Sequence, residues 1–119
     1  MRSFKEIAIQ YLTEWNNKNE AALKKLHQDF EHKSPDTDFK SKQEFIDACW
    51  GKHHSGTTNI VYAYEDDTSA LIIHKVNLND KAYDICEQFH FENGLIKKCK
   101  VWYYIIILNN VNRFTKSGY

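Results

Sequence analysis

The apolar positions at the start of the chain follow a helical period. They recur at three- and four-residue intervals, at Phe4, Ile7, Ala8, Tyr11, Leu12 and Trp15. On a helix this spacing places all of these side chains on one face. The pattern therefore predicts an amphipathic helix from Ser3 to Asn16 that buries this face.

A second, shorter helix is predicted after it, capped by Asn17 or Asn19, because a short polar side chain accepts hydrogen bonds from first-turn amides. It carries Ala22, Leu23 and Leu26 and ends near Gln28. An extended segment, Phe30 to Ser34, follows and stops at Pro35.

A polar stretch, Asp36 to Lys40, leads to Ser41 and Glu44, which have the spacing of a capping box. They predict the start of a third helix. The sequence then places Gly51 where a left-handed residue would end that helix. The inward side of this helix is expected to carry Phe45, Ile46, Cys49 and Trp50.

From Thr57 onward the period changes to two, which is typical of strands. The turns fall at Asp66 to Ser69, at Asn79-Asp80 and at Asn93-Gly94, and the last dipeptide favours a tight hairpin. The predicted strands form an antiparallel meander and run over 59–65, 70–78, 81–92 and 95–108. We therefore predict an α+β fold in one domain, residues 1–108, with a tail over 109–119.

Charge and hydropathy argue against binding to nucleic acid and to membranes. Lys plus Arg and Asp plus Glu both total 16, so no net positive charge favours binding to nucleic acid. The start of the chain lacks the apolar stretch of a signal peptide, and Val101 to Leu108 is too short to span a membrane as a helix. These features predict a cytoplasmic protein that binds neither nucleic acid nor membranes.

Motifs for metals and cofactors are not found in the sequence. The three cysteines, Cys49, Cys86 and Cys99, show no C-x-x-C spacing, and the adjacent His53 and His54 make only a weak case for a metal. We expect no metal and no cofactor. The high aromatic content of 14% suits a chain that lines a roomy apolar cavity.

The element order, with the closing hairpin motif Phe89-x-Phe91-x-Asn93-Gly94-x-Ile96, resembles the nuclear transport factor 2-like superfamily, which includes SnoaL-like proteins and ketosteroid isomerases. The resemblance covers roughly Phe4 to Tyr104. It implies a cone-shaped, cystatin-like fold, in which three N-terminal helices pack on a strongly bent antiparallel sheet and enclose a pocket. It also implies dimers that pair through the outer sheet face.

The ketosteroid isomerase resemblance implies roles for three positions. The oxyanion-hole tyrosine falls on Tyr11, and the oxyanion-hole aspartic acid falls on Glu87. The aspartate base falls on Ser34, immediately before Pro35. Because serine has no carboxylate, it cannot replace this base at neutral pH.

Glu87 shares a strand face with Tyr83, Ile85, Phe89 and Phe91, so it is an acid among apolar neighbours. Two interpretations are open. Burial could keep Glu87 neutral, as a hydrogen-bond donor or general acid, which is the state of the oxyanion-hole aspartic acid in ketosteroid isomerase. Alternatively, Glu87 is a structural acid held by Tyr11 or by a histidine.

His32 lies two residues before Ser34 and would point to the same side, which makes it the best substitute base. A core histidine bonded to the backbone is the alternative. His74 interrupts an apolar set and is a possible partner of Glu87. The residues predicted to line the pocket, besides the catalytic set Tyr11, His32 and Glu87, are Trp15, Phe30, Ser34, Trp50, Tyr62, His74, Phe89 and Tyr103.

The last predicted strand has an outer face for association. Alternation separates Lys98, Lys100, Trp102 and Tyr104 from the inward residues, and an outward apolar patch there needs covering. A homodimer through this face is predicted.

Two functions follow. The first is a pocket protein for a hydrophobic small molecule, with a cofactor-free isomerase or lyase of a carbonyl compound as its enzymatic form. The second is a non-catalytic dimeric module that binds a ligand or a protein.

Overall fold

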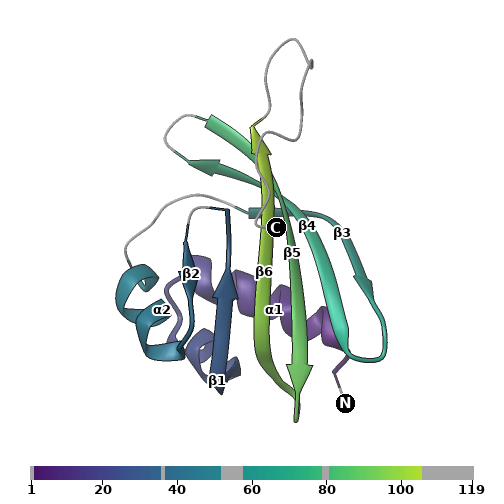
Figure 1. The fold of residues 1–119 in the computed structure, drawn as a ribbon. Coiled ribbons are helices and arrows are strands. Elements are labelled where there is room, and N and C mark those ends of the chain that lie inside the picture. The colour runs from purple at the N-terminus through teal and green to yellow at the C-terminus, as the bar shows by residue number, and fades with distance from the viewer. Residues whose placement is uncertain (1, 36, 52–57, 79–80, 106–119) are drawn as a thin grey trace.

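The computed structural model describes residues 2–35, 37–51, 58–78 and 81–105. The described chain is α+β: two helices are followed by two strands, a third helix and four long strands, and the six strands form one sheet that packs against the helices (Figure 1). The predicted tail, the last residues of the fourth long strand, and His53 and His54 lie outside the described residues.

Helix α1 spans Phe4–Asn16, as the apolar period predicts. It begins with a capping box, in which the Ser3 side chain accepts from the Glu6 amide and the Glu6 carboxylate accepts from the Ser3 amide. Its buried residues are Ala8, Tyr11 and Leu12. The helix lies across one face of the sheet, against β3 and β4 (Figure 1).

The second helix is shorter than predicted. It is a 3₁₀ helix, η1, over Glu20–Lys25, with Asn19 as its N-cap. The predicted end near Gln28 is wrong, because Leu26 already begins strand β1 (Leu26–Lys33) and pairs with Ile96 of strand β6. Because Ile96 lies 70 residues further along the chain than Leu26, the sequence around Leu26 does not indicate that a strand begins there.

Strand β1 turns back at Ser34. The Ser34 hydroxyl donates to the Thr37 carbonyl over 2.8 Å and accepts from the Thr37 amide over 3.2 Å. The chain then forms the short strand β2 (Asp38–Phe39), antiparallel to β1, inside a stretch whose sequence predicts only a polar connection.

Helix α2 spans Lys42–Cys49 and packs against β1. The Ser41 side chain accepts from the Glu44 amide, as predicted for the cap, and Gly51 has φ of +72° just after the helix. Phe45 is the buried residue of this helix, while Ile46, Cys49 and Trp50 are half-buried.

The long strands are β3 (Thr58–Glu65), β4 (Ser69–Leu78), β5 (Lys81–Glu92) and β6 (Leu95–Ile105). Each pairs antiparallel with the next, which confirms the predicted meander. Asn93 and Gly94 have φ values of 54° and 76°, so both central residues of the tight turn are left-handed, as a type I′ hairpin requires.

The sheet order is β2-β1-β6-β5-β4-β3. Because β1 runs parallel to β6, the sheet is mixed, and the prediction of an antiparallel sheet is wrong in this one pairing. The last long strand, β6, therefore lies beside the first strand of the chain, β1, in space (Figure 1).

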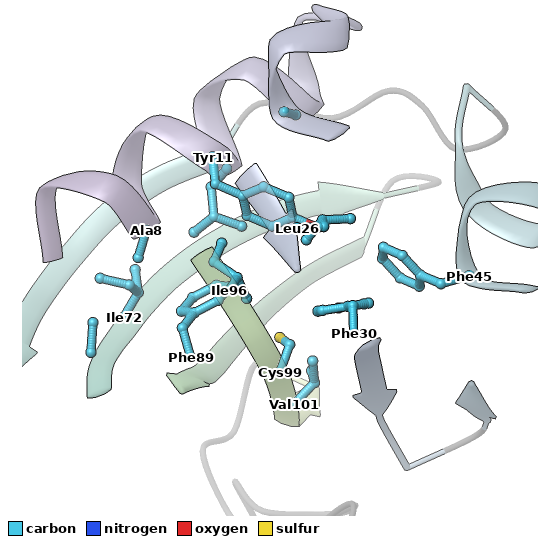
Figure 2. Close-up of a cluster of buried hydrophobic side chains, with 13 residues drawn as sticks. Ala8, Tyr11, Leu26, Phe30, Phe45, Ile72, Phe89, Ile96, Cys99 and Val101 are labelled. Atoms are coloured by element: carbon cyan, nitrogen blue, oxygen red, sulfur yellow. The ribbon is translucent and has the colours of Figure 1, made fainter. Parts of the chain in front are cut away.

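One apolar core lies between the helices and the sheet. Figure 2 shows Tyr11 of α1 facing Phe89 and Ile96 of the sheet. The members of this core are Ala8, Tyr11, Leu12, Ala22, Leu26, Phe30, Phe45, Ala70, Ile72, Phe89, Ile96, Cys99 and Val101. None of the helices in the described part of the chain is long and apolar enough to cross a membrane.

Candidate functional site

Four residues with polar or titratable side chains lie on four adjacent strands, one on each, on the core-facing side of the sheet. His32 of β1 lies opposite Cys99 of β6, and Glu87 of β5 lies opposite Val101, two residues further along β6. His74 of β4 lies opposite Ile85, two residues before Glu87. We call His32, Cys99, Glu87 and His74 the polar diagonal.

Glu87 accepts two side-chain hydrogen bonds at the centre of the polar diagonal. Nε2 of His74 lies 2.8 Å from Oε1 of Glu87, and Sγ of Cys99 lies 3.3 Å from Oε2. His74 is 3% exposed and Cys99 is 2% exposed. Both oxygens of the carboxylate are therefore held by groups that are themselves buried.

Burial raises the pKa of Glu87, but the hydrogen bond with His74, the two nearby imidazoles and the Cys99 hydrogen bond together lower it below its ordinary value. The group is therefore an ionised carboxylate at neutral pH. The lowered pKa does not favour the interpretation of Glu87 as a neutral donor or general acid, and the 2.8 Å contact confirms that a histidine, His74, holds it.

Two imidazole nitrogens of the polar diagonal lack a hydrogen-bond partner. Among the described side chains, Nδ1 of His32 and Nδ1 of His74 are buried and have no hydrogen-bond partner. Buried polar atoms are nearly always paired, so each exception asks for an explanation such as a ligand or water. These two atoms mark the polar diagonal as the candidate site.

His32 is surrounded by aromatic rings. Its imidazole stacks on Phe45 with centroids 4.7 Å apart, and Phe39 and Phe30 lie at 5.9 Å and 6.4 Å. Burial lowers the pKa of His32, and the nearby charges of Glu87 and Asp38 offset this only in part. A neutral imidazole can accept a proton, and the role of His32 as a base stays a prediction.

Tyr11 approaches the polar diagonal from helix α1. It is 4% exposed, and its ring meets Phe89 edge-on at 5.8 Å (Figure 2). Burial raises its pKa well above the ordinary value, and the negative charge of Glu87 adds to this shift. The phenol keeps its proton and remains a hydrogen-bond donor.

The three residues predicted to be catalytic are brought into one electrostatic neighbourhood. The charge of Glu87 acts on both Tyr11 and His32. Of the two interpretations left open for Glu87, the contact with His74 favours the structural acid held by a histidine.

The aromatic residues predicted to line a pocket form a continuous cluster beside His32. The ring centroid of Trp15 lies 5.1 Å from that of Phe45 and 5.0 Å from that of Trp50, and the centroids of Phe30 and Phe45 are 5.1 Å apart. Phe30 and Phe89 are fully buried. These side chains supply the apolar surroundings of the polar diagonal.

Three other predicted lining residues have different positions. Tyr62 is 55% exposed and stacks on Tyr64 with ring centroids 6.0 Å apart, on the other side of the sheet from Ala63, which packs against the core. The Ser34 hydroxyl is used in the turn to Thr37. Tyr103 belongs to β6, but its side chain lies outside the described residues.

Cys99 is the site residue that the sequence analysis did not single out. Alternation placed it on the inward side of its strand, but a lone cysteine without C-x-x-C spacing has no signal for a partner. Its contact with Glu87 depends on the register of β5 and β6. In the part of the chain that the structure describes, no group of three or more His, Cys, Asp or Glu residues has the geometry to hold a metal ion.

Comparison with protein-family models gives no match for this sequence, and comparison with curated proteins gives none either. Solved structures do match. A nuclear transport factor 2-like protein of unknown function from Cytophaga hutchinsonii is 18% identical, with a TM-score of 0.77 over 87% of this chain and 91% of that one.

Two further structures carry suggested or known activities. A proposed ketosteroid isomerase from Kribbella flavida is 13% identical, with a TM-score of 0.79 over 92% of this chain and 88% of that one. An LEH-like epoxide hydrolase of M. tuberculosis is 10% identical, with a TM-score of 0.73 over 83% and 80% of the two chains. At these identities the likeness is one of fold.

Proposed function

Because this chain has the nuclear transport factor 2-like fold, we propose that it binds a hydrophobic small molecule in a pocket at the polar diagonal, inside the cone formed by the bent sheet and the helices. The single observation that carries this proposal is the pair of buried, unpartnered Nδ1 atoms of His32 and His74. Each of these atoms costs desolvation energy unless a ligand or a water forms a hydrogen bond with it, and a ligand site would account for both.

The same residues support a cofactor-free isomerase or lyase that acts on a carbonyl compound. The imidazole of His32 or His74 would take a proton from the carbon next to the carbonyl. The electron pair left on that carbon moves to the carbonyl oxygen, and Tyr11 donates a hydrogen bond to it. The charge of Glu87 stabilises the imidazolium that forms. Return of the proton to another carbon completes an isomerisation, while loss of a leaving group completes an elimination.

This proposal changes the role of one of the three residues from the role that the sequence analysis gave it. His32 keeps the role of base and Tyr11 that of donor, while Glu87 moves from donor to ionic partner of the histidines. The proposed ketosteroid isomerase and the LEH-like epoxide hydrolase of the same fold support a pocket in which proton transfer takes place.

Proton abstraction can be tested with 2-tetralone, a hydrophobic enolisable ketone, by following hydrogen–deuterium exchange at its α carbon in D₂O by NMR. We expect the protein to accelerate exchange, and His32→Gln and His74→Gln each to reduce the acceleration by roughly 10²-fold. His27→Gln is the matched control. His27 is also a buried histidine, but it is bound to Glu92 over 3.2 Å, outside the polar diagonal.

Calorimetric titration of the same ketone separates the two candidate functions. Binding without accelerated exchange would favour the non-catalytic binding module. Accelerated exchange that survives both His32→Gln and His74→Gln would remove the polar diagonal from the mechanism.

We also propose that two copies associate through the outer sheet face. Tyr62 and Tyr64 of the edge strand β3 are each 55% exposed, and they lie opposite Ile73 and Leu71 of β4. The same face continues through β5 to Trp102 of β6, which is opposite Cys86. Large exposed aromatic side chains are enriched where proteins associate.

A further inference from the structure

Cys99 lies between two titratable members of the polar diagonal. It is opposite His32 of β1 in the register of the sheet, and its Sγ atom lies 3.3 Å from Oε2 of Glu87 on β5. The residue is 2% exposed, and Figure 2 shows its sulfur among the buried side chains of the core. A thiol in this place can act on the site without contact with solvent.

The Cys99 thiol is a hydrogen-bond donor in its contact with Glu87. Burial, together with the charge of Glu87, raises the pKa of the thiol well above its ordinary value, so the sulfur keeps its hydrogen. An ionised carboxylate can only accept. The hydrogen on Sγ is therefore directed to Oε2, whichever protonation state the imidazole of His74 has.

Two neighbouring strands hold the Glu87 carboxylate, one oxygen each. Nε2 of His74 on β4 lies 2.8 Å from Oε1, and Sγ of Cys99 on β6 lies 3.3 Å from Oε2. Strands β4 and β6 lie on either side of β5. A rotation of the carboxylate plane away from His74 would therefore also break its contact with Cys99.

The thiol also favours the charge on Glu87. A hydrogen bond to the ionised form of a carboxylate lowers its pKa, and the Cys99 contact acts on Glu87 in this direction. In the proposed reaction this charge stabilises the imidazolium that forms when a histidine takes a proton. A carboxylate that is well oriented and ionised before the reaction needs no rearrangement when the imidazolium appears.

We propose that Cys99 is a positioning residue, whose thiol holds the Glu87 carboxylate ionised and turned to His74, where it stabilises the imidazolium formed by proton abstraction. The thiol acts through Glu87 and forms no bond with the substrate. The role in the reaction rests on the proposed function, whereas the hydrogen bond itself can be measured on the protein without any ligand.

Cys86 provides a matched control for every variant of Cys99. It is a half-buried thiol next to Glu87 on β5, but alternation directs it to the other side of the sheet, opposite Trp102. The titratable groups whose interactions with Glu87 have to be followed, one on each of four other elements, are Tyr11 of α1, His32 of β1, His74 of β4 and Cys99 of β6.

The hydrogen bond can be tested on the wild-type protein by infrared spectroscopy of the S–H stretching band. The Cys99 band is assigned from its loss in Cys99→Ser. Because a thiol that donates to a carboxylate has a weakened S–H bond, we expect this band at a lower wavenumber than that of a thiol without an acceptor. A Cys99 band at the position of a thiol without an acceptor would overturn the proposal.

Cys99→Ala and Cys99→Ser separate the donor from the loss of sulfur, because the two side chains are similar in size and only serine can donate. ¹³C NMR of the Glu87 carboxyl group, assigned from its loss in Glu87→Gln, gives the midpoint of its titration. We expect a higher midpoint in Cys99→Ala than in the wild-type protein, and a low midpoint in Cys99→Ser and in Cys86→Ala. Equal midpoints in Cys99→Ala and Cys99→Ser would overturn the proposal. Should Cys99→Ala fail to fold, as seen by circular dichroism, the infrared band decides.

Hydrogen–deuterium exchange of 2-tetralone tests the role in the reaction. We expect Cys99→Ala to reduce the acceleration roughly tenfold, as the loss of a group that orients another does, and Cys99→Ser to restore most of it. A raised Glu87 midpoint with unchanged acceleration would overturn the positioning role and leave the proposed reaction standing. A wild-type protein that gives no acceleration would contradict the proposed reaction and with it the role of Cys99 in it, while the infrared band still decides the hydrogen bond.

Discussion

His74 and Glu87 form a buried hydrogen-bonded pair across strands β4 and β5, with Nε2 and Oε1 2.8 Å apart. A hydrogen bond of this kind fixes the orientation of the imidazole ring. The pair also makes the core sensitive to the loss of one partner, because the other then remains buried without its charge-assisted hydrogen bond.

Glu87→Gln should destabilise the fold by about 1–3 kcal/mol at pH 7, because it removes the charge that holds His74 and Cys99. The pKa of Glu87 is lowered in the folded state, so its contribution is fully present above its ordinary pKa and is lost as pH falls through the lowered value. Urea unfolding at several pH values should therefore show the two proteins converging below about pH 4. Glu31→Gln, at an exposed site on β1, is the control and should be close to neutral throughout. A Glu87→Gln deficit that is constant from pH 7 to pH 3 would contradict the ionised state.

His32→Phe should change how stability depends on acid. Burial lowers the pKa of His32. Below about pH 6.5 His32 is therefore protonated to a greater extent in the unfolded chain than in the folded protein, and the native state loses stability as pH falls. Phenylalanine cannot bind this proton, so the variant should lose less stability than the wild-type protein between pH 7 and pH 5. The measurement is the free energy of unfolding in urea at each pH. Parallel pH profiles would show that His32 is protonated equally well in both states.

Gly94→Ala should cost about 1 kcal/mol of stability, because an L-residue with a side chain is strained at φ of +76°. A Cβ atom built at Gly94 meets nothing within 4 Å, so the loss is one of backbone conformation alone. Gly94→Asn tolerates the left-handed region better and should cost clearly less than Gly94→Ala. Equal costs for the two variants would point to something other than backbone strain. Urea denaturation resolves a difference of this size.

Trp102→Glu and Tyr64→Glu should each weaken the proposed homodimer by more than about 30-fold, which corresponds to the roughly 2 kcal/mol or more of an interface hot spot. Light scattering at micromolar concentration should give a dimer mass for the wild-type protein and a monomer mass for both variants. Gln43→Glu, on the exposed side of α2, should remain dimeric. A wild-type protein that is already monomeric would contradict the proposed dimer.

Local patterns in the sequence predicted most of the fold. The apolar face of the helix from Phe4 to Trp15 and the Asn93-Gly94 turn depend on neighbours within a few residues. Both could therefore be predicted from the sequence, and both were confirmed. The end of η1 and the parallel pairing of β1 depend on Ile96 and Cys99, which lie far along the chain. No local pattern encodes such a pairing.

The candidate site was predictable only in part. Alternation placed Glu87 and His74 among inward residues and indicated that they could be partners. The direction of the Glu87 pKa shift could not be foreseen, because it is decided by the balance of burial against hydrogen bonds from His74 and Cys99. The outward position of Tyr62 follows a register shift in the β3–β4 pairing between Ile60 and Tyr62, which reverses the inward and outward sides.

The parallel pairing of β1 with β6 has a consequence for the order of folding. During synthesis β1 emerges well before its partner, so Leu26 and Phe30 stay without their sheet neighbours until the meander has been completed. Contacts of such high sequence separation slow folding and leave apolar side chains open to aggregation in the meantime. The final strand thus completes the core and the polar diagonal in a single step, and we expect the nascent chain to be incompetent for binding until β6 has left the ribosome.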